Sequence, residues 1–192
     1  MVAAAKLRRA QESAEASRPY SERFNAVLAG LASSVGASEC APLLLRGTGT
    51  DQTQLRVGLT AERGLCGGFT ASLVKLARTK AELLIASGKT VKILTVGKKG
   101  REQLKREYGD LFIGHVDLSD VKRVGYDNAV DVAKDVLARF DTGEFDVATI
   151  FFNRFESVIS QIPTEQQIIP ASFEVSEDVG SATVYDYEPS EE

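Results

Sequence analysis

The chain has 192 residues, of which 43% are hydrophobic and 26% charged, enough for one compact α/β domain plus an extended element. No apolar run approaches the roughly 18 to 20 residues that span a bilayer, and no apolar signal-peptide segment follows the basic start. The net charge of −4 gives no reason to expect nucleic acid, one histidine argues against a histidine-rich metal site, and two cysteines without paired spacing fit a reducing compartment.

Residues 1–39 are predicted to form a long helix with a coiled-coil seam. Spacings that alternate between four and three residues select small and apolar side chains: Ala3, Leu7, Ala10, Ala14, Ser17, Ser21, Phe24, Leu28, Leu31 and Val35. Pro19 predicts a break or kink at Arg18, because proline removes a backbone hydrogen bond and clashes with the preceding turn. Since the seam keeps its phase across Pro19, one kinked helix of roughly 55 Å is favoured over two helices.

Such a helix needs a partner, because a narrow apolar stripe does not stabilise a long helix alone. The chain contains no second segment of matching length. Ser190, followed by two glutamates, is typical of a helix N-cap, so we expect a partner helix to begin there and to continue beyond this sequence. The alternative is an acidic tail without structure. The predicted domains are a shaft helix over 1–39 and an α/β domain with an acidic C-terminal tail over 40–192.

Strands and helices alternate after the glycine-rich segment 47–50. The predicted strands cover 55–59, 91–96, 111–113 and 145–152, and the predicted helices cover 70–87, 98–108 and 126–140. Extended strands or edges are also expected at 158–162, 166–169 and 184–187. This alternation predicts an α/β fold with a Rossmann-like, mainly parallel and doubly wound sheet.

Two helices have predicted buried faces, and the single histidine has a predicted place. Leu73, Ala77, Ala81 and Leu84 are expected to face inward from helix 70–87. The residues expected to face inward from helix 126–140 are Ala129, Ala133, Val136, Leu137 and Phe140. His115 is expected to end a short strand.

The turn from Arg63 to Phe69 lies where doubly wound folds bind phosphate, between the first strand and its helix. Its glycines do not have the G-x-G-x-x-G spacing, and it lacks the lysine of a P-loop. No acid after the second strand is placed to hold a ribose, although Lys98 and Lys99 leave a phosphorylated dinucleotide open. Cys66 has no histidine near it in sequence, so a structural cysteine is favoured over a nucleophile. The glycines themselves are explained by a sharp turn and close packing.

Three segments carry a resemblance to a known family: MVAAAKLRRAQ at 1–11, ERGLCGGF at 62–69 and NRFESVISQIP at 153–163. Together, and in this order, they resemble the gamma subunit of F-type ATP synthases, and the Gly-Gly-Phe of the turn looks bacterial. Ala61 and Glu62 stand where the family often has Ser-Asp, and Thr70 where it often has Asn. Family members normally have a helical stretch before Met1 and a long helix after Glu192, so the chain is expected to be a fragment.

The resemblance implies a non-catalytic rotor with no cofactor and no metal. Its terminal helices would form a coiled coil inside the hexamer of alpha and beta subunits, and its α/β domain would contact the epsilon subunit and the c-subunit ring. The complex would couple proton flow to ATP synthesis from the cytoplasmic side of the bacterial cell membrane, with no direct insertion of this chain. The implied contacts with beta are Lys6, Arg8, Arg9, Arg63, Gly64, Leu65, Cys66, Gly67, Gly68 and Phe69. The alternatives are a nucleotide-binding Rossmann-like enzyme and a generic coiled-coil adaptor.

Overall fold

The computed structural model describes residues 2–35 and 41–172. The described residues divide into two units, one containing the helix α1 (Val2–Val35) and the other running from Pro42 to Ala171. Each unit is described by itself. The predicted strand at 184–187 lies outside the described residues.

Helix α1 passes through Pro19 without ending. Proline cannot donate to the carbonyl of Glu15, four residues earlier. On either side of it, the hydroxyls of Ser17 and Ser21 donate to the carbonyls of Ala14 and Ser17, at 3.0 and 3.2 Å. Tyr20 and Phe24 stack with their ring centres 6.0 Å apart.

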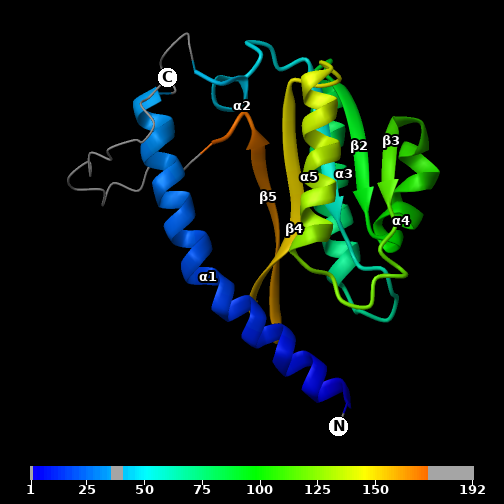
Figure 1. Ribbon diagram of the computed structural model, residues 1–192. Coiled ribbons are helices and arrows are strands. Elements are labelled where there is room, and N and C mark those ends of the chain that lie inside the picture. The colour runs from blue at the N-terminus through cyan, green and yellow to red at the C-terminus, as the bar shows by residue number, and fades with distance from the viewer. Residues whose placement is uncertain (1, 36–40, 173–192) are drawn as a thin grey trace. The chain divides into compact units, whose positions relative to one another are not determined.

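The second unit contains a five-stranded sheet with the strand order β3-β2-β1-β4-β5 (Figure 1). The first four strands in sequence run parallel to one another: β1 (Thr53–Leu59), β2 (Thr90–Val96), β3 (Phe112–Val116) and β4 (Val147–Ser157). The last strand, β5 (Ser160–Ile169), runs antiparallel to β4. The prediction of a mainly parallel sheet is therefore confirmed.

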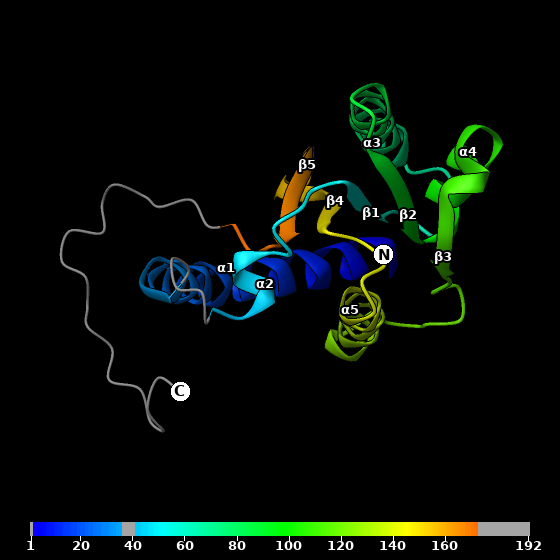
Figure 2. The ribbon, with the colours of Figure 1, turned by 90° about the horizontal axis from the view of Figure 1, so that it is seen from above.

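Three helices cover the two faces of this sheet. Figure 2 shows α3 (Phe69–Ala86) and α4 (Lys98–Tyr108) on one face and α5 (Tyr126–Asp141) on the other. Two shorter helices connect segments, α2 (Leu43–Arg46) and the 3₁₀ helix η1 (Gly109–Leu111). Helices on both faces explain why β2 carries apolar side chains on both of its sides, as strands of a parallel sheet commonly do.

The main core lies between the sheet and α5. Leu55 and Val57 of β1, Leu94 of β2, and Val136 and Phe140 of α5 belong to one buried cluster. On the other face of the sheet, α3 packs on β2 through a smaller buried apolar cluster of Ala81, Val91 and Ile93. The alternation of β2 side chains between the two clusters is the period-two pattern of a strand.

Three details differ from the sequence-based prediction. On α5, Ala129, Ala133 and Leu137 are exposed, and Val132 packs on the core instead. The reason is that the stripe centred on Val136 and Phe140 is narrower than the alanine pattern indicated. The predicted strand at 111–113 starts at Phe112 and extends to Val116, with His115 near its end. The segments predicted at 158–162 and 166–169 are a tight turn followed by one continuous strand, β5.

Pro163 lies inside β5 because β5 is an outer strand of the sheet, where one side of the backbone needs no partner strand. Pro163 is paired with Asn153 of β4. Edge strands are where proline is tolerated, so the continuous strand does not conflict with the sequence.

The segments by which the chain enters and leaves the second unit are joined. The amide of Ala171 donates to the carbonyl of Leu44 at 2.8 Å. Gly47, with φ of +77°, lies so close to Pro170 that an added Cβ would be 3.2 Å from its Cγ. The two ends of the unit therefore meet at one point.

Candidate functional site

The glycine-rich turn connects β1 to α3 and is exposed from Arg63 to Gly68. Leu65 is the extreme case, with a relative exposure of 109% and a left-handed backbone at φ 61°. Gly67 also has positive φ, at 58°, and Gly68 is the N-cap residue of α3. Only glycine adopts this conformation without strain, so Leu65 occupies a costly position while its side chain is exposed.

Short-range and long-range hydrogen bonds hold the turn in place. The amide of Phe69 donates to the carbonyl of Cys66 at 3.3 Å. The side-chain amide of Asn153, on β4, donates to the carbonyl of Phe69 at 3.0 Å. The Cys66 thiol lies 3.8 Å from the hydroxyl of Thr70. The turn is thus tied to the strand that leads into the β4–β5 hairpin.

Glu62 connects three loops at the same edge of the sheet. Its carboxylate accepts hydrogen bonds from the amide of Leu118 at 2.8 Å, the amide of Lys98 at 3.1 Å and the hydroxyl of Ser119 at 3.2 Å. The carboxylate therefore caps the N-terminus of α4, where a helix otherwise attracts an external anion. Glu62 was not among the predicted site residues, because no local pattern indicates a partner 56 residues away.

Close packing around Thr60 fixes the start of the turn. The Thr60 hydroxyl accepts from the amide of Gly100 at 3.0 Å and lies 3.2 Å from the carbonyl of Val96. An added Cβ on Gly97 would be 2.2 Å from the Thr60 carbonyl oxygen, and one on Gly100 would be 2.4 Å from its methyl carbon. The absence of side chains at Gly97 and Gly100 is what lets the two loops approach.

An open pocket lies between the turn and the β4–β5 hairpin. Its volume is about 310 Å³. The lining comes from the turn and α3 on one side and from the hairpin on the other: Cys66, Gly68, Phe69, Ser72, Asn153, Ile159, Ser160 and Gln161. None of these side chains is formally charged at neutral pH. The pocket offers hydroxyl and amide groups, which suit an uncharged hydrogen-bonding partner.

Several cations at this edge have no ion-pair partner within the part of the chain that the structure describes. They come from the loops that follow β1 and β3 and from helix α4, which follows β2: Arg63, Arg101, Lys122 and Arg123. The nearby acid Glu102 is paired with Lys99 at 2.6 Å, and the Glu62 carboxylate is engaged by backbone amides. The edge is therefore suited to an acidic partner.

The other predicted contact residues belong to the first unit. Lys6, Arg8 and Arg9 are exposed on α1, and Arg8 pairs with Glu12 at 2.9 Å. The turn from Arg63 to Phe69 belongs to the second unit. The three basic residues therefore lie together on α1 in the first unit, and the residues of the turn lie together in the second unit.

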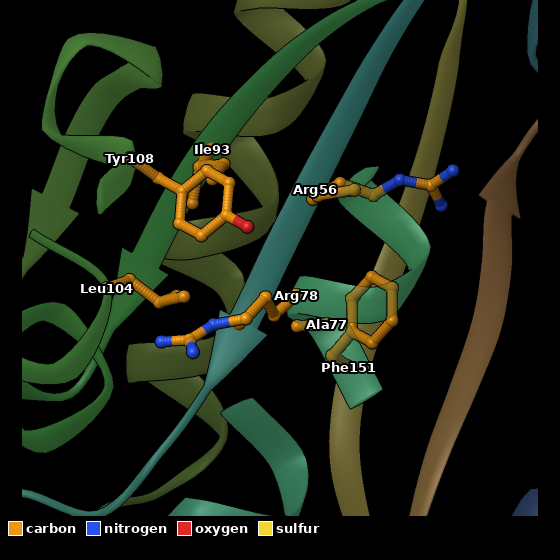
Figure 3. Close-up of a pocket in the computed structure, with 9 residues that line it drawn as sticks. Arg56, Ala77, Arg78, Ile93, Leu104, Tyr108 and Phe151 are labelled. Carbon is orange, nitrogen blue, oxygen red and sulfur yellow. The ribbon is translucent and has the colours of Figure 1, made fainter. Parts of the chain in front are cut away.

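A second, smaller cavity lies under α3 and α4, as Figure 3 shows. Its volume is about 20 Å³, and its lining is almost wholly apolar. The guanidinium groups of Arg56 and Arg78 point away from each other in Figure 3. Burial lowers the pKa of Arg56, whose guanidinium lies 5.7 Å from the ring centre of Phe151, while the charge of Glu165 acts in the opposite direction.

The polar groups at the turn form no recognisable reactive set. Cys66 is a free, exposed cysteine, whereas the Nδ1 of His115 lies on β3, 2.9 Å from the Thr95 hydroxyl. Over residues 2–35 and 41–172, no cluster of three or more His, Cys, Asp or Glu side chains could hold a metal ion. No helix in these same ranges is long and apolar enough to cross a membrane.

Known proteins resemble this chain along its whole length. A family model described as ATP synthase matches residues 1–192. The ATP synthase gamma chain of Dinoroseobacter shibae is 77% identical over 192 residues, and that of Ruegeria pomeroyi is 66% identical. All of this chain is covered in both cases, and it spans 66% of the length of each relative.

A solved structure shares the fold. The central stalk and c-ring of the Tetrahymena thermophila mitochondrial ATP synthase matches with a TM-score of 0.54 and 27% identity. The match covers 64% of this chain and 52% of that one. With a family model that matches from the first residue to the last, this chain belongs to the ATP synthase family, and the relatives it resembles are gamma chains.

Proposed function

We propose that this chain is part of the gamma subunit that forms the central rotor stalk of a bacterial F-type ATP synthase. The observation that carries the proposal is the family match over residues 1–192, joined by 77% identity to a gamma chain. In this role the shaft of the chain turns inside the hexamer of alpha and beta subunits. Its α/β body contacts the epsilon subunit and the c-subunit ring and turns together with them. It works at the cytoplasmic side of the cell membrane as a peripheral part of the complex.

The proposed role is mechanical and non-catalytic. Rotation of an asymmetric shaft changes the beta subunits one after another, so that proton flow biases their conformational equilibrium from outside the catalytic site. We assign residues 1–39 to the shaft and residues 40–192 to the body. A helix of 34 residues is about 50 Å long. Its seam residues Leu7 and Phe24 are 49% and 50% exposed, which supports pairing with another helix.

Two groups of residues are proposed to contact beta subunits. The first is the basic set Lys6, Arg8 and Arg9 on α1, and the second is the turn from Arg63 to Phe69. The second assignment is supported by the exposure of the turn and by the cations around it that lack ion pairs in the described structure. A rotating contact benefits from shallow electrostatic attraction, because a deep specific pocket would hold the rotor at one angle.

The test uses a gamma chain of the relatives' full length that carries this sequence, mixed with alpha and beta subunits. We expect a stable complex whose ATP hydrolysis drives rotation of gamma, seen with a bead attached to the body. A matched chain in which Lys6, Arg8, Arg9 and Arg63 are changed to glutamine should assemble more weakly at low salt, and the difference should shrink at high salt, where screening weakens the attraction of the unaltered chain. Failure of the unaltered chain to assemble or rotate would leave only the adaptor interpretation.

A further inference from the structure

The backbone hydrogen bonds of α1 are altered at three carbonyls that lie within about one turn of the helix. Pro19 cannot donate to the carbonyl of Glu15, so one bond of the helix is missing. The hydroxyl of Ser17 donates to the carbonyl of Ala14 at 3.0 Å, and the hydroxyl of Ser21 donates to that of Ser17 at 3.2 Å. A side-chain donor that shares a helical carbonyl in this way weakens the helix and favours a bend.

The side chains along the predicted seam do not compensate for these weakened bonds. Only small residues occupy the seam here: Ala10, Ala14, Ser17 and Ser21. The nearest large seam residues, Leu7 and Phe24, lie on either side of this stretch and are 49% and 50% exposed. Bending at the small residues therefore displaces no large side chain from a partner helix.

Side-chain pairs support the helical turns before and after this stretch. On the N-terminal side, Arg8 pairs with Glu12 at 2.9 Å. On the C-terminal side, the rings of Tyr20 and Phe24 are stacked, with centres 6.0 Å apart and planes inclined by 12°. Both pairs are four residues apart, the spacing that stabilises a helix. The weakness is thus confined to residues 14–21.

We propose that residues 14–21 form a hinge in the shaft helix, at which α1 bends while the turns on either side stay helical. Along the sequence the hinge lies between the basic residues assigned to beta (Lys6, Arg8 and Arg9) and the body. What the hinge does rests on the proposed function. It lets the end of the shaft follow each beta subunit as that subunit changes shape, while the body stays aligned with the c-subunit ring.

The direct test measures the spread of a distance across the hinge in a gamma chain of the relatives' full length. Spin labels are attached through Ala5→Cys and Ala26→Cys, both exposed positions of α1, after the two native cysteines are changed to serine. The labelled positions lie roughly 31 Å apart along an unbroken helix. Pulsed electron–electron double resonance records the distribution of distances between the two labels.

We expect Pro19→Ala to narrow this distribution by roughly 1.5-fold or more, because residue 19 can then donate to the Glu15 carbonyl. The matched control is Ser13→Ala, at an exposed position of the same helix, which raises helix propensity without restoring a backbone bond. The control should leave the width unchanged. Equal widths with and without Pro19, or equal narrowing by the control, would overturn the hinge.

A second measurement records the angular fluctuation of a bead on the body between rotation steps of the assembled complex. Pro19→Ala should reduce this fluctuation, and Ser13→Ala should not. Unchanged fluctuation would overturn the role of the hinge in the rotor. A complex that does not assemble or rotate counts against the proposed function instead, and the label distances in the gamma chain alone still decide whether the hinge exists.

Discussion

Single glycines in the second unit have opposite roles, and the surrounding atoms decide which. Gly97 combines φ of +95° with the Thr60 carbonyl oxygen 2.2 Å from the place of a Cβ. Backbone atoms cannot move aside as a flexible side chain does. We expect Gly97→Ala to destabilise the chain by about 3 kcal/mol or more, measured by urea unfolding. A loss below about 1 kcal/mol would contradict this packing.

Gly58 provides the opposite case and the control. Nothing lies within 4 Å of an added Cβ, and Gly58 lines the 20 Å³ cavity under α3 and α4. Gly58→Ala therefore introduces no clash and reduces the freedom of the unfolded chain. The expected gain is about 1 kcal/mol, or a rise of roughly 3 °C in melting temperature. Destabilisation would show that the cavity is too small for a methyl group.

Asp146 gives the second unit a pH-dependent contribution to stability. The pKa of its carboxyl is lowered, first by the hydrogen bond from Thr50, then by those from the Thr53 amide and the Thr48 hydroxyl. A carboxyl with a lowered folded-state pKa stabilises above its unfolded pKa, about 3.9, and loses this effect as pH falls through the folded value.

The corresponding variant is Asp146→Asn, which keeps the shape but cannot accept from the Thr53 amide with its nitrogen. We expect a loss of about 1 kcal/mol in unfolding free energy at pH 7, shrinking as the pH falls below about 4. Urea unfolding of both proteins at pH 7 and below about pH 4 measures this difference in unfolding free energy. Equal losses at both pH values would mean that the ionised carboxylate is not responsible.

At the scale of elements, Glu62 holds together loops that belong to three different strand–helix connections. Glu62→Ala leaves the amides of Lys98 and Leu118 without their acceptor. We expect these two amides to exchange hydrogen roughly tenfold faster, with a loss of about 1 kcal/mol in stability. Glu102→Ala is the control, since Glu102 pairs with Lys99, three residues away on an exposed face of the same helix. Unchanged exchange at Leu118 would contradict the role of Glu62.

The elements themselves were largely predictable, because helix and strand periods are local properties of the sequence. Helix α4 was predicted with its observed bounds, and α3 within one residue at each end. The errors have physical reasons. Val158 and Ile159 have strand-forming side chains, so their place in a turn is invisible to propensity. Ala129 and Ala133 are small enough to lie on either the buried or the exposed face of a helix. Which face they occupy depends on packing with core residues that are distant in sequence.

The candidate site was less predictable than the fold. The turn from Arg63 to Phe69 was recognisable from its glycines and its position after the first strand. Asn153 and Glu62 were not, because their hydrogen-bond partners lie 36 to 84 residues away in the sequence. The strand order of the sheet was also not predictable, since no local sequence pattern indicates that β1 lies between β2 and β4.

At the scale of the molecule, the two units should differ in stability. The second unit buries side chains on both faces of a sheet, whereas Leu7, Tyr20 and Phe24 of α1 are 49%, 74% and 50% exposed. In the chain alone, we expect amides of α1 to exchange at least a hundredfold faster than those of β1 and β4. Hydrogen exchange with mass spectrometry measures this. Equal protection would show that α1 is stabilised without a partner helix.

The bond between Ala171 and Leu44 has a consequence for how such a chain can be rearranged. A module whose first and last residues are neighbours can be inserted into a loop of another protein without stretching its host, and it can be circularised with a short linker. The second unit therefore has adjacent ends, the geometry that insertion into a loop of another protein requires.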